Sequence, residues 1–492
     1  MTDTEQKDGK GWGSGGLFGN RALGSLMLML ITPFFCLLFI HTCLHHHGSF
    51  ISLAQEIRSK NIVDFILHVW PTPFDPYAVK IIYSFIAFEL FLVKIVPGKE
   101  FRATVTASGH VPIYTANGVQ CYLITILSLF AVAYVGFFKP GDIYDNLDKI
   151  VSTLNLTAIV FCTFLTVKGL NFPSTKDSGS NGNVIVDFFW GTELYPRVLG
   201  WDVKQCTNCR IGMMFWQVAI LAYGFKQYDL LNGEISSSIV VSIVLQTIYI
   251  AKFFVWETGY FCSMDIQHDR AGYYICWGCL VWVPSMYTIH TFFMVEHPIA
   301  LSLPVTIFLI AAGTFSIWAN YDCDRYAHPL LCSLLTSSDD LFPSHSSPID
   351  NASASAPPTA RRRSGARSPT TSSPSTRPRM ERNAPPSCWH RAGGVSQGSC
   401  RSLFLSFPEL TALLSPRRHF HYVPEILAAF FWCVPTSLNL EGWILPLFYP
   451  IYLTLLLLDR AWRDDLRCSD KYTESWELYC KKVPYKIIPG VV

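Results

Sequence analysis

Residues 22–44 read ALGSLMLMLITPFFCLLFIHTCL, an apolar run without Asp, Glu, Lys or Arg. A helix that crosses a membrane needs about 20 mostly apolar residues to span roughly 30 Å of hydrocarbon. The run is too long for the apolar part of a signal peptide, and more apolar runs follow it. It therefore predicts a first transmembrane helix and decides the class of the fold.

Nine comparable runs follow the first one. They lie at about 77–97, 118–138, 150–170, 211–228, 235–256, 272–295, 299–320, 424–437 and 443–459. Only 15% of the residues are charged, whereas soluble domains have about 25%. We expect an all-α, polytopic protein of the lipid bilayer with about ten transmembrane helices.

Basic residues are concentrated in alternate loops. If the N-terminus is cytosolic, one side of the membrane receives Lys99, Arg102, Lys176, Arg197, Lys204, Arg210 and the basic C-terminus. The opposite loops are short or acidic. The positive-inside rule therefore places both termini in the cytosol. The net charge of +2 gives no reason to expect nucleic acid as a partner.

Composition divides the chain into four parts. Residues 1–20 are polar and glycine-rich and predict a disordered tail, and 21–327 form the membrane core with eight spans. Residues 328–416 are rich in Ser, Pro and Arg and predict a disordered cytosolic insert. Residues 417–492 hold the last two spans and a cytosolic C-terminus. The insert is either a phosphorylated or lipid-binding linker, or translated non-coding sequence without selected structure.

The sixteen cysteines and a histidine run raise the question of metal binding. Cys206/Cys209 and Cys276/Cys279 have CxxC spacing, but zinc needs four ligands and no second pair stands near either one in the sequence. The run 45–47, three histidines, ends the first span and fits an interfacial polar cap. We expect no metal site.

Ionisable residues cluster between two spans, at 256–287. Such groups are costly at membrane depth and tend to line cavities. Candidates for a general acid and its orienting partners are Glu257, Asp265, His268, Asp269 and Tyr273, and the neighbouring aromatic residues could wall a flat apolar substrate. A structural salt-bridge cap between two helices is the alternative.

Two further polar clusters lie at 177–197 and 459–480. The second carries arginines and a lysine that could hold phosphates or anchor a helix end at anionic headgroups. No GxGxxG, Walker, GxSxG or HExxH motif occurs in a supporting context, so a cofactor site here would not be a Rossmann fold.

These clusters, in this order, resemble the sterol reductase family that includes the C14-reductases and the lamin B receptor. The resembling stretches are TASGHVPIYTANG at 106–118, residues 177–197, NCRIGM at 208–213, MDIQHDRAGYYICWGCLVWVP at 264–284, RHFHYVPEI at 418–426 and residues 459–490. Within the family, HDRAG at 268–272, WGC at 277–279, YDCDR at 321–325 and HFHY at 419–422 look most like the plant form of the Δ7-reductase branch.

The resemblance implies ten transmembrane helices, residence in the endoplasmic reticulum membrane, a sterol pocket within the bundle and NADPH bound on the cytosolic side. Other sterol-pathway enzymes are possible partners. Carried over by position, the NADPH contacts are His421, Tyr422, Asp464, Cys468, Ser469, Asp470, Lys471, Tyr472 and Tyr479. Thr473 stands where the family usually has Gly.

The resemblance breaks at 328–416. There the family has basic NADPH-binding residues and a Leu-Leu-x-Ser-Gly-Trp-Trp-Gly motif, and this chain has neither. The implied reaction is NADPH-dependent reduction of the C7–C8 bond of a Δ5,7-sterol. The alternatives are a C14-sterol reductase, more remotely a methyltransferase of the isoprenylcysteine type, and a sterol-binding protein that has lost NADPH binding.

Overall fold

The computed structural model describes residues 20–103, 105–106, 108–336, 418–437 and 445–487. The expected tail at 1–20, apart from Asn20, lies outside this part, as does the expected insert from 337 onward. Helix α15 continues to Thr336, beyond the boundary expected at 327.

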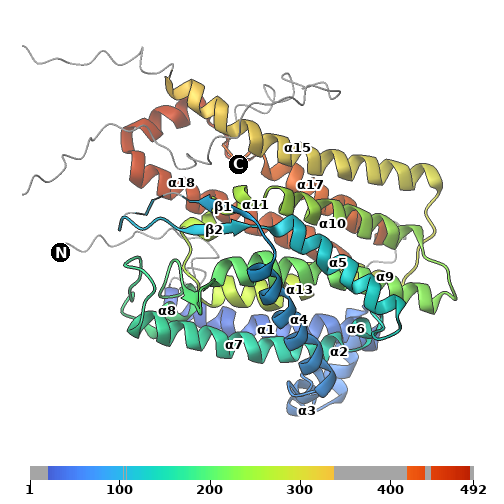
Figure 1. Ribbon diagram of the computed structural model, residues 1–492. Coiled ribbons are helices and arrows are strands. Elements are labelled where there is room, and N and C mark those ends of the chain that lie inside the picture. Colours follow the sequence, from blue (N-terminus) through green and yellow to red (C-terminus); the bar gives the residue numbers. More distant parts are fainter. Residues whose placement is uncertain (1–19, 104, 107, 337–417, 438–444, 488–492) are drawn as a thin grey trace, which may run out of the picture. The chain divides into compact units, whose positions relative to one another are not determined.

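Helices make up nearly all of the described chain (Figure 1). The first half contains α1 (Arg21–His46), α2 (Phe50–Ser59), α3 (Ile62–Val69), α4 (Pro76–Ile95), α5 (Gly118–Tyr134), α6 (Asp142–Asp145), α7 (Leu147–Asn171) and α8 (Val184–Trp190). The second half contains α9 (Met213–Leu230), α10 (Ser237–Val255), α11 (Glu257–Tyr260), α12 (Met264–Gln267), α13 (Val283–Met286), α14 (Ile289–Met294), α15 (Leu303–Thr336), α17 (Tyr422–Cys433) and α18 (Phe448–Lys482). Two π-helices, η3 (Gln205–Gly212) and η4 (Tyr273–Trp282), and two 3₁₀ turns, η6 (Val434–Thr436) and η7 (Leu445–Leu447), complete the helical part.

The strands are short. Strand β1 (Lys99–Arg102) pairs antiparallel with β2 (Ile113–Ala116), and β3 (Arg197–Val198) pairs antiparallel with β4 (Trp201–Asp202). These two hairpins lie in loops between membrane helices, so the expectation of an all-α membrane protein is confirmed.

Four described helices are long and apolar enough to cross a membrane on their own. They are α1, α7, α10 and the part of α15 from Leu303 to Cys323. Each of the other expected spans also falls on helical structure, but that structure is shorter, interrupted or carries more charge. The span expected at 272–295, for example, is divided into η4, α13 and α14.

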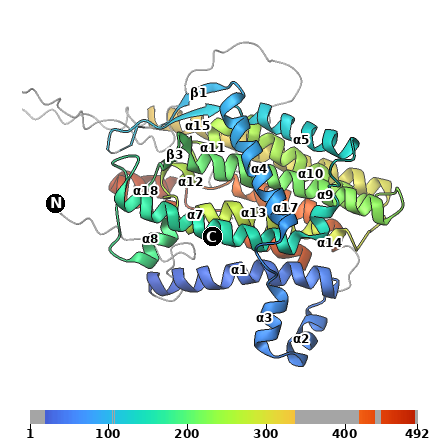
Figure 2. The ribbon, with the colours of Figure 1, turned by 60° about the horizontal axis from the view of Figure 1, so that its bottom comes forward.

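Helices α1, α7 and η4 pack together and bury one large apolar cluster (Figures 1 and 2). A second cluster lies among α9, α10, α17 and the first turns of α18. The fully buried rings of Trp216 and Trp432 belong to this second cluster. The C-terminal helices are therefore held against the centre of the membrane core.

The two π-helices contact each other closely. A Cβ atom on Gly212 at the end of η3 would lie 2.7 Å from the carbonyl oxygen of Cys279 in η4, so glycine permits this approach. Both CxxC pairs lie on these helices, and all four thiols are buried and free. The π-helical turn widens the helix locally, a feature that is frequent near functional sites.

Candidate active site

The segment from 257 to 272 crosses between α10 and η4 as two short helices, α11 and α12. Lys204, whose side chain is completely buried, holds this segment in place. The Lys204 Nζ donates to the backbone carbonyls of Asp265, Ile266 and Asp269 at 3.0, 2.5 and 2.9 Å. Burial lowers the pKa of Lys204 to about 8. A lysine at the C-terminal end of a short helix thus satisfies carbonyls that have no partner in the helix.

Two arginines on one face of α18 reach the carboxylates of this segment. Arg460 Nη2 lies 2.5 Å from Asp265 Oδ2. Arg463 Nη1 lies 3.3 Å from Asp269 Oδ2, and its Nε lies 3.1 Å from Asp459 Oδ2. Asp269 and Asp459 are buried. Removal of one partner from a buried ion pair typically costs about 3–5 kcal/mol, so these pairs fix α18 against the acidic segment.

The polar cluster at 177–197 contacts the end of the same segment, at Arg270 and Ala271. Arg270 Nη1 donates to the carbonyl of Gly179 at 2.7 Å, and Ala271 N donates to the carbonyl of Glu193 at 2.9 Å. The backbones of Gly191 and Gly272 touch, because a Cβ on Gly272 would lie only 2.2 Å from Gly191 N. Three polar clusters that are far apart in the sequence therefore meet at one end of the bundle.

Aromatic rings surround the Arg463 guanidinium. Its Cζ lies 5.7 Å from the ring centre of Tyr274 and 5.9 Å from that of Trp190, and its Nη2 lies 3.3 Å from the Tyr274 hydroxyl. Tyr274 was not among the sequence-predicted residues. It adjoins the predicted Tyr273 in the sequence, and only the helical phase of η4 decides which of the two faces the arginine.

The five predicted acid-segment residues do not all meet. Asp265 and Asp269 lie together, and His268 lies between them with an exposed side chain. Glu257 instead forms a buried ion pair with Arg210 at 2.5 Å and accepts from Gly118 N at 2.9 Å.

Tyr273 also faces another part of the bundle. Its hydroxyl lies 2.9 Å from Thr32 Oγ1 of α1, and its ring stacks on Trp277 at 4.8 Å. Glu257 and Tyr273 therefore have their contacts with η3, α5 and α1, whereas Asp265 and Asp269 face α18.

Of the predicted cofactor residues at the start of α17, Tyr422 lies near Arg460 and Asp464 of α18, whereas His421 lies near Lys252 of α10 and its backbone carbonyl accepts from Asn320 Nδ2 of α15. His419 stacks on Tyr422 with ring centres 5.1 Å apart, and His419 Nε2 lies 3.9 Å from Asp464 Oδ2. The His421 imidazole is uncharged at neutral pH, because burial and the nearby Lys252 lower its pKa to about 4. Burial also raises the pKa of the Tyr422 hydroxyl.

The remaining cofactor residues follow along α18. Cys468 is buried, whereas Ser469 and Asp470 are exposed. Burial raises the pKa of the Tyr479 hydroxyl, which lies near Arg418. The side chains of Lys471 and Tyr472 are outside the described part of the chain.

A cavity of about 300 Å³ lies beside these residues. It is lined by Arg418, Leu458, Ala461, Trp462, Pro484 and Lys486. Arg418 and Lys486 both pair with Asp465, the latter at 3.0 Å, and the Lys486 ammonium lies 4.8 Å from the Trp462 ring centre. The cavity is therefore cationic and aromatic.

Three buried arginine donors in this region have no hydrogen-bond partner among the residues that the structure describes. They are Arg418 Nε, Arg460 Nε and Arg467 Nη1. Buried guanidinium N–H groups that lack acceptors are costly, and an anionic ligand would satisfy them. Arginine is also the side chain best suited to phosphate. The donor set therefore fits a phosphate-bearing cofactor.

Comparison with known proteins identifies relatives across most of the chain. The model of the ergosterol biosynthesis ERG4/ERG24 family matches residues 13–327 and 413–492. A 7-dehydrocholesterol reductase from Arabidopsis thaliana is 40% identical over 475 residues, which cover 95% of this chain and 96% of that protein. A 7-dehydrocholesterol reductase from Xenopus laevis is 29% identical over 84% of this chain and 80% of its own length. A Delta(14)-sterol reductase from Methylotuvimicrobium alcaliphilum is 27% identical over 80% of this chain and 78% of its own length.

Proposed function

Because this chain belongs to the ergosterol biosynthesis ERG4/ERG24 family, we propose that it reduces the C7–C8 double bond of Δ5,7-sterols with NADPH. Membership makes it a membrane-bound sterol reductase, an oxidoreductase that acts on a carbon–carbon bond. The family uses a nicotinamide cofactor. The 40% identity to a plant 7-dehydrocholesterol reductase supports the Δ7 bond over the Δ14 bond.

One observation carries the proposal at the level of residues. The ion pairs of Arg460 with Asp265 and of Arg463 with Asp269 bring the predicted acid segment against the predicted cofactor helix. A hydride donor and a proton donor must both reach the same double bond, so these two segments have to meet.

The bound cofactor supplies the hydride, and the protein supplies position and the proton. Asp265 is held by Arg460 and Asp269 by Arg463. We assign them to orientation of the segment and of its exposed His268, which delivers the proton. Glu257 and Tyr273 belong to the same candidate set, and their partners Arg210 and Thr32 give them a supporting role.

NADPH is proposed to lie along α18. The residues proposed to hold it are His421, Tyr422, Asp464, Cys468, Ser469, Asp470, Lys471, Tyr472 and Tyr479, with the unsatisfied donors of Arg418, Arg460 and Arg467 for its phosphates. This arrangement supports catalysis over a sterol-binding protein without cofactor. Micromolar NADPH binding by the purified chain would exclude that non-enzyme alternative.

The location is also part of the proposal. The chain lies in a membrane, and its substrate reaches it there. We place it in the endoplasmic reticulum with both termini in the cytosol, where other sterol-pathway enzymes are candidate partners. Protease accessibility of tags at the two ends in sealed microsomes tests the orientation.

Feeding experiments test the reaction. The full chain is expressed in a host without sterol reductases, which receives a Δ5,7-sterol or a Δ8,14-sterol, and products are measured by mass spectrometry. Loss of the Δ7 bond alone supports the proposal, and loss of the Δ14 bond alone contradicts it.

Substitutions in the acid segment test its role. His268→Gln and Asp269→Asn should each lower turnover by about 10²-fold or more, the usual contribution of acid–base groups. Asp229→Asn is the matched control, since Asp229 is an exposed carboxylate on α9. Unchanged turnover in both variants would remove the assignment.

A further inference from the structure

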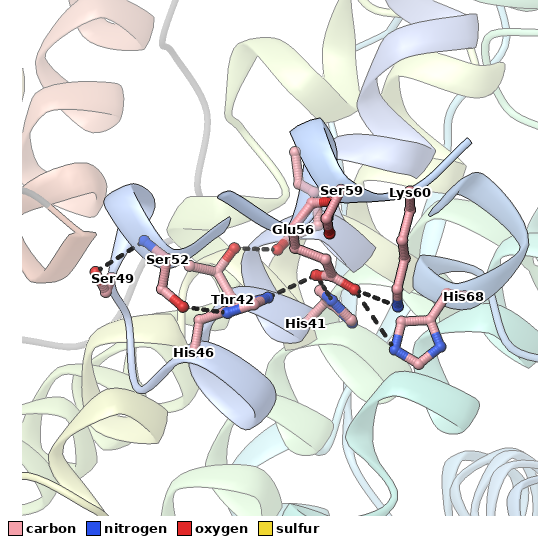
Figure 3. Close-up of polar contacts among 10 residues, drawn as sticks. His41, Thr42, His46, Ser49, Ser52, Glu56, Ser59, Lys60 and His68 are labelled. Atoms are coloured by element: carbon pink, nitrogen blue, oxygen red, sulfur yellow. Dashed lines mark hydrogen bonds and ion pairs between the residues drawn. The ribbon is translucent and has the colours of Figure 1, made fainter. Parts of the chain in front are cut away.

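A cluster of imidazoles surrounds one carboxylate at the end of α1, away from the reductase site (Figure 3). His41 Nε2 and His46 Nε2 lie 3.0 and 2.6 Å from Glu56 Oε2. His68 Nε2 and Lys60 Nζ lie 3.7 and 2.6 Å from Glu56 Oε1. Nothing in the proposed sterol reduction uses these groups.

The cluster is built by three helices. His41 and His46 come from the last turns of α1, Glu56 from α2 and His68 from α3. In Figures 1 and 2, α2 and α3 form a hairpin that projects from the end of α1. The sequence indicated only a histidine cap at 45–47, because the Glu56 carboxylate and the His68 imidazole come from helices that follow it.

The donor set suits zinc. Histidine nitrogens bind Zn²⁺ at about 2.0–2.1 Å and carboxylate oxygens at about 2.0–2.2 Å, so tetrahedral ligand atoms lie about 3.3 Å apart. One ligand atom from each of His41, Glu56 and His68 lies within 4.8 Å of the other two. His41 Nε2 lies 3.0 Å from Glu56 Oε2, and His68 Nε2 lies 3.7 Å from the other carboxylate oxygen, Oε1. Side-chain rotations that bring both imidazoles to one carboxylate oxygen would therefore supply three of the four ligand positions.

A second interaction orients the neighbouring histidine. His46 Nδ1 lies 2.7 Å from Ser52 Oγ, which leaves its Nε2 directed at the Glu56 carboxylate. Metal-binding histidines almost always hold their other ring nitrogen in such a hydrogen bond. His46 lies outside the group of three whose ligand atoms are within 4.8 Å of one another, so it reaches the fourth position only by moving toward the ion.

Another carboxylate adds negative charge nearby. Asp148 of α7 interacts electrostatically with His45, whose ring centre lies 4.6 Å from that of His41. Asp148 Oδ1 is buried and, within the described part of the chain, has no hydrogen-bond partner. Two carboxylates next to several imidazoles favour a divalent cation.

Lys60 is the group that competes with a metal. Its ammonium occupies one oxygen of Glu56, but its side chain is 37% exposed and can swing into solvent on its flexible stem. The side chains of Glu56 and His41 are 11% and 4% exposed, whereas that of His68 is 49% exposed. His68 therefore forms the side through which an ion would enter.

We propose that this cluster binds one Zn²⁺ ion, with Glu56, His41 and His68 as ligands and His46 in the fourth position. The ion links the end of α1 to the α2–α3 hairpin and so fixes that hairpin on the membrane core. The site is independent of the reductase reaction, so failure of either proposal leaves the other intact.

Zinc binding by the full-length chain in detergent tests this proposal. The affinity tag must lack histidines, and metal is first removed with a chelator. Titration with Zn²⁺, followed by metal analysis after desalting, should give about one ion per chain. Co²⁺ in place of zinc should give the visible absorption bands of a tetrahedral site.

Matched variants separate a metal site from a hydrogen-bonded cluster. Glu56→Gln and His68→Gln should weaken zinc binding by at least about tenfold. His47→Gln should leave it unchanged, since His47 is exposed and pairs with Glu296 instead at 2.8 Å. Lys60→Ala should tighten it, because the competing ammonium is gone.

Tighter zinc binding by Lys60→Ala cannot be explained by misfolding, whereas weaker binding by Glu56→Gln or His68→Gln could be. Zinc binding that is equal in the parent chain, His68→Gln and Lys60→Ala would overturn the proposal, as would less than 0.1 ion per chain at saturation, a level on the order of contamination. The cluster would then connect α1 to α2 and α3 by hydrogen bonds and ion pairs alone.

Discussion

At the residue scale, Thr473 occupies a backbone conformation that suits glycine. Its φ is 42° and its ψ is −113°, inside the C-terminal helix α18. A Cβ makes this region costly, and a β-branched residue is the least suited to it. The sequence resemblance placed glycine at this position in relatives, and the geometry gives the physical reason.

We therefore expect Thr473→Gly to stabilise the protein by about 1–3 kcal/mol, the usual cost of such a strained residue. Thermal unfolding of the detergent-solubilised chain measures the gain. Thr473→Ala is the control, because it keeps the Cβ and should gain less. Equal melting temperatures for the glycine and alanine variants would show that the turn is not strained.

At the element scale, two buried histidines stand at the start of α17: His419 lies near Asp464 of α18, and His421 lies near Lys252 of α10. Burial lowers the pKa of His419 to about 3 and that of His421 to about 4, compared with an ordinary value of 6.5. The unfolded chain therefore binds protons at a higher pH than the folded chain does. The contribution of these two histidines to the free energy of unfolding should be complete above pH 6.5 and should decrease as the pH falls toward 4.

His421→Asn tests this window, since asparagine has the hydrogen-bonding groups without the titration. The variant should show a shallower loss of melting temperature between pH 7 and pH 4.5 than the parent chain. His110→Asn is a control, because His110 lies in the loop between β1 and β2. The expectation fails if the parent and His421→Asn lose stability equally as the pH falls.

At the scale of the whole molecule, residues 328–412 are outside the family match, while both flanks are inside it. The resemblance puts basic NADPH-binding residues in this stretch, and this chain has a Ser/Pro/Arg-rich sequence instead. In the proposed cofactor site, phosphate neutralisation would depend on the arginines around α18.

Replacement of 328–412 by the corresponding stretch of the Arabidopsis thaliana reductase should raise NADPH affinity by about tenfold, because two cations placed at the cofactor phosphates contribute about 1.4 kcal/mol together. Fluorescence titration measures the affinity. The same replacement with its basic residues changed to Gln is the control and should show no gain. Equal affinity in all three proteins would mean that the insert does not impair the cofactor site.

The apolar runs were sufficient to predict the class of fold. Each expected span falls on helical structure, because the hydrocarbon core forces every backbone polar group to be satisfied within a helix. Boundaries and breaks were not predictable in this way. The division of 272–295 into η4, α13 and α14, and the extension of α15 to Thr336, depend on packing rather than on local hydropathy.

The candidate residues divide along the same line. Residue types and family motifs predicted Asp265, Asp269 and the C-terminal cluster from the sequence, because such groups are rare and expensive in a membrane. Only the tertiary structure decided their partners. Contacts between distant segments decide which tyrosine of the 273–274 pair faces Arg463 and that Glu257 pairs with Arg210. They also decide that Glu56 of α2 collects histidines from two other helices, α1 and α3. Hydropathy is a local property that can be read from the sequence, whereas the pairing of charges depends on how the helices pack.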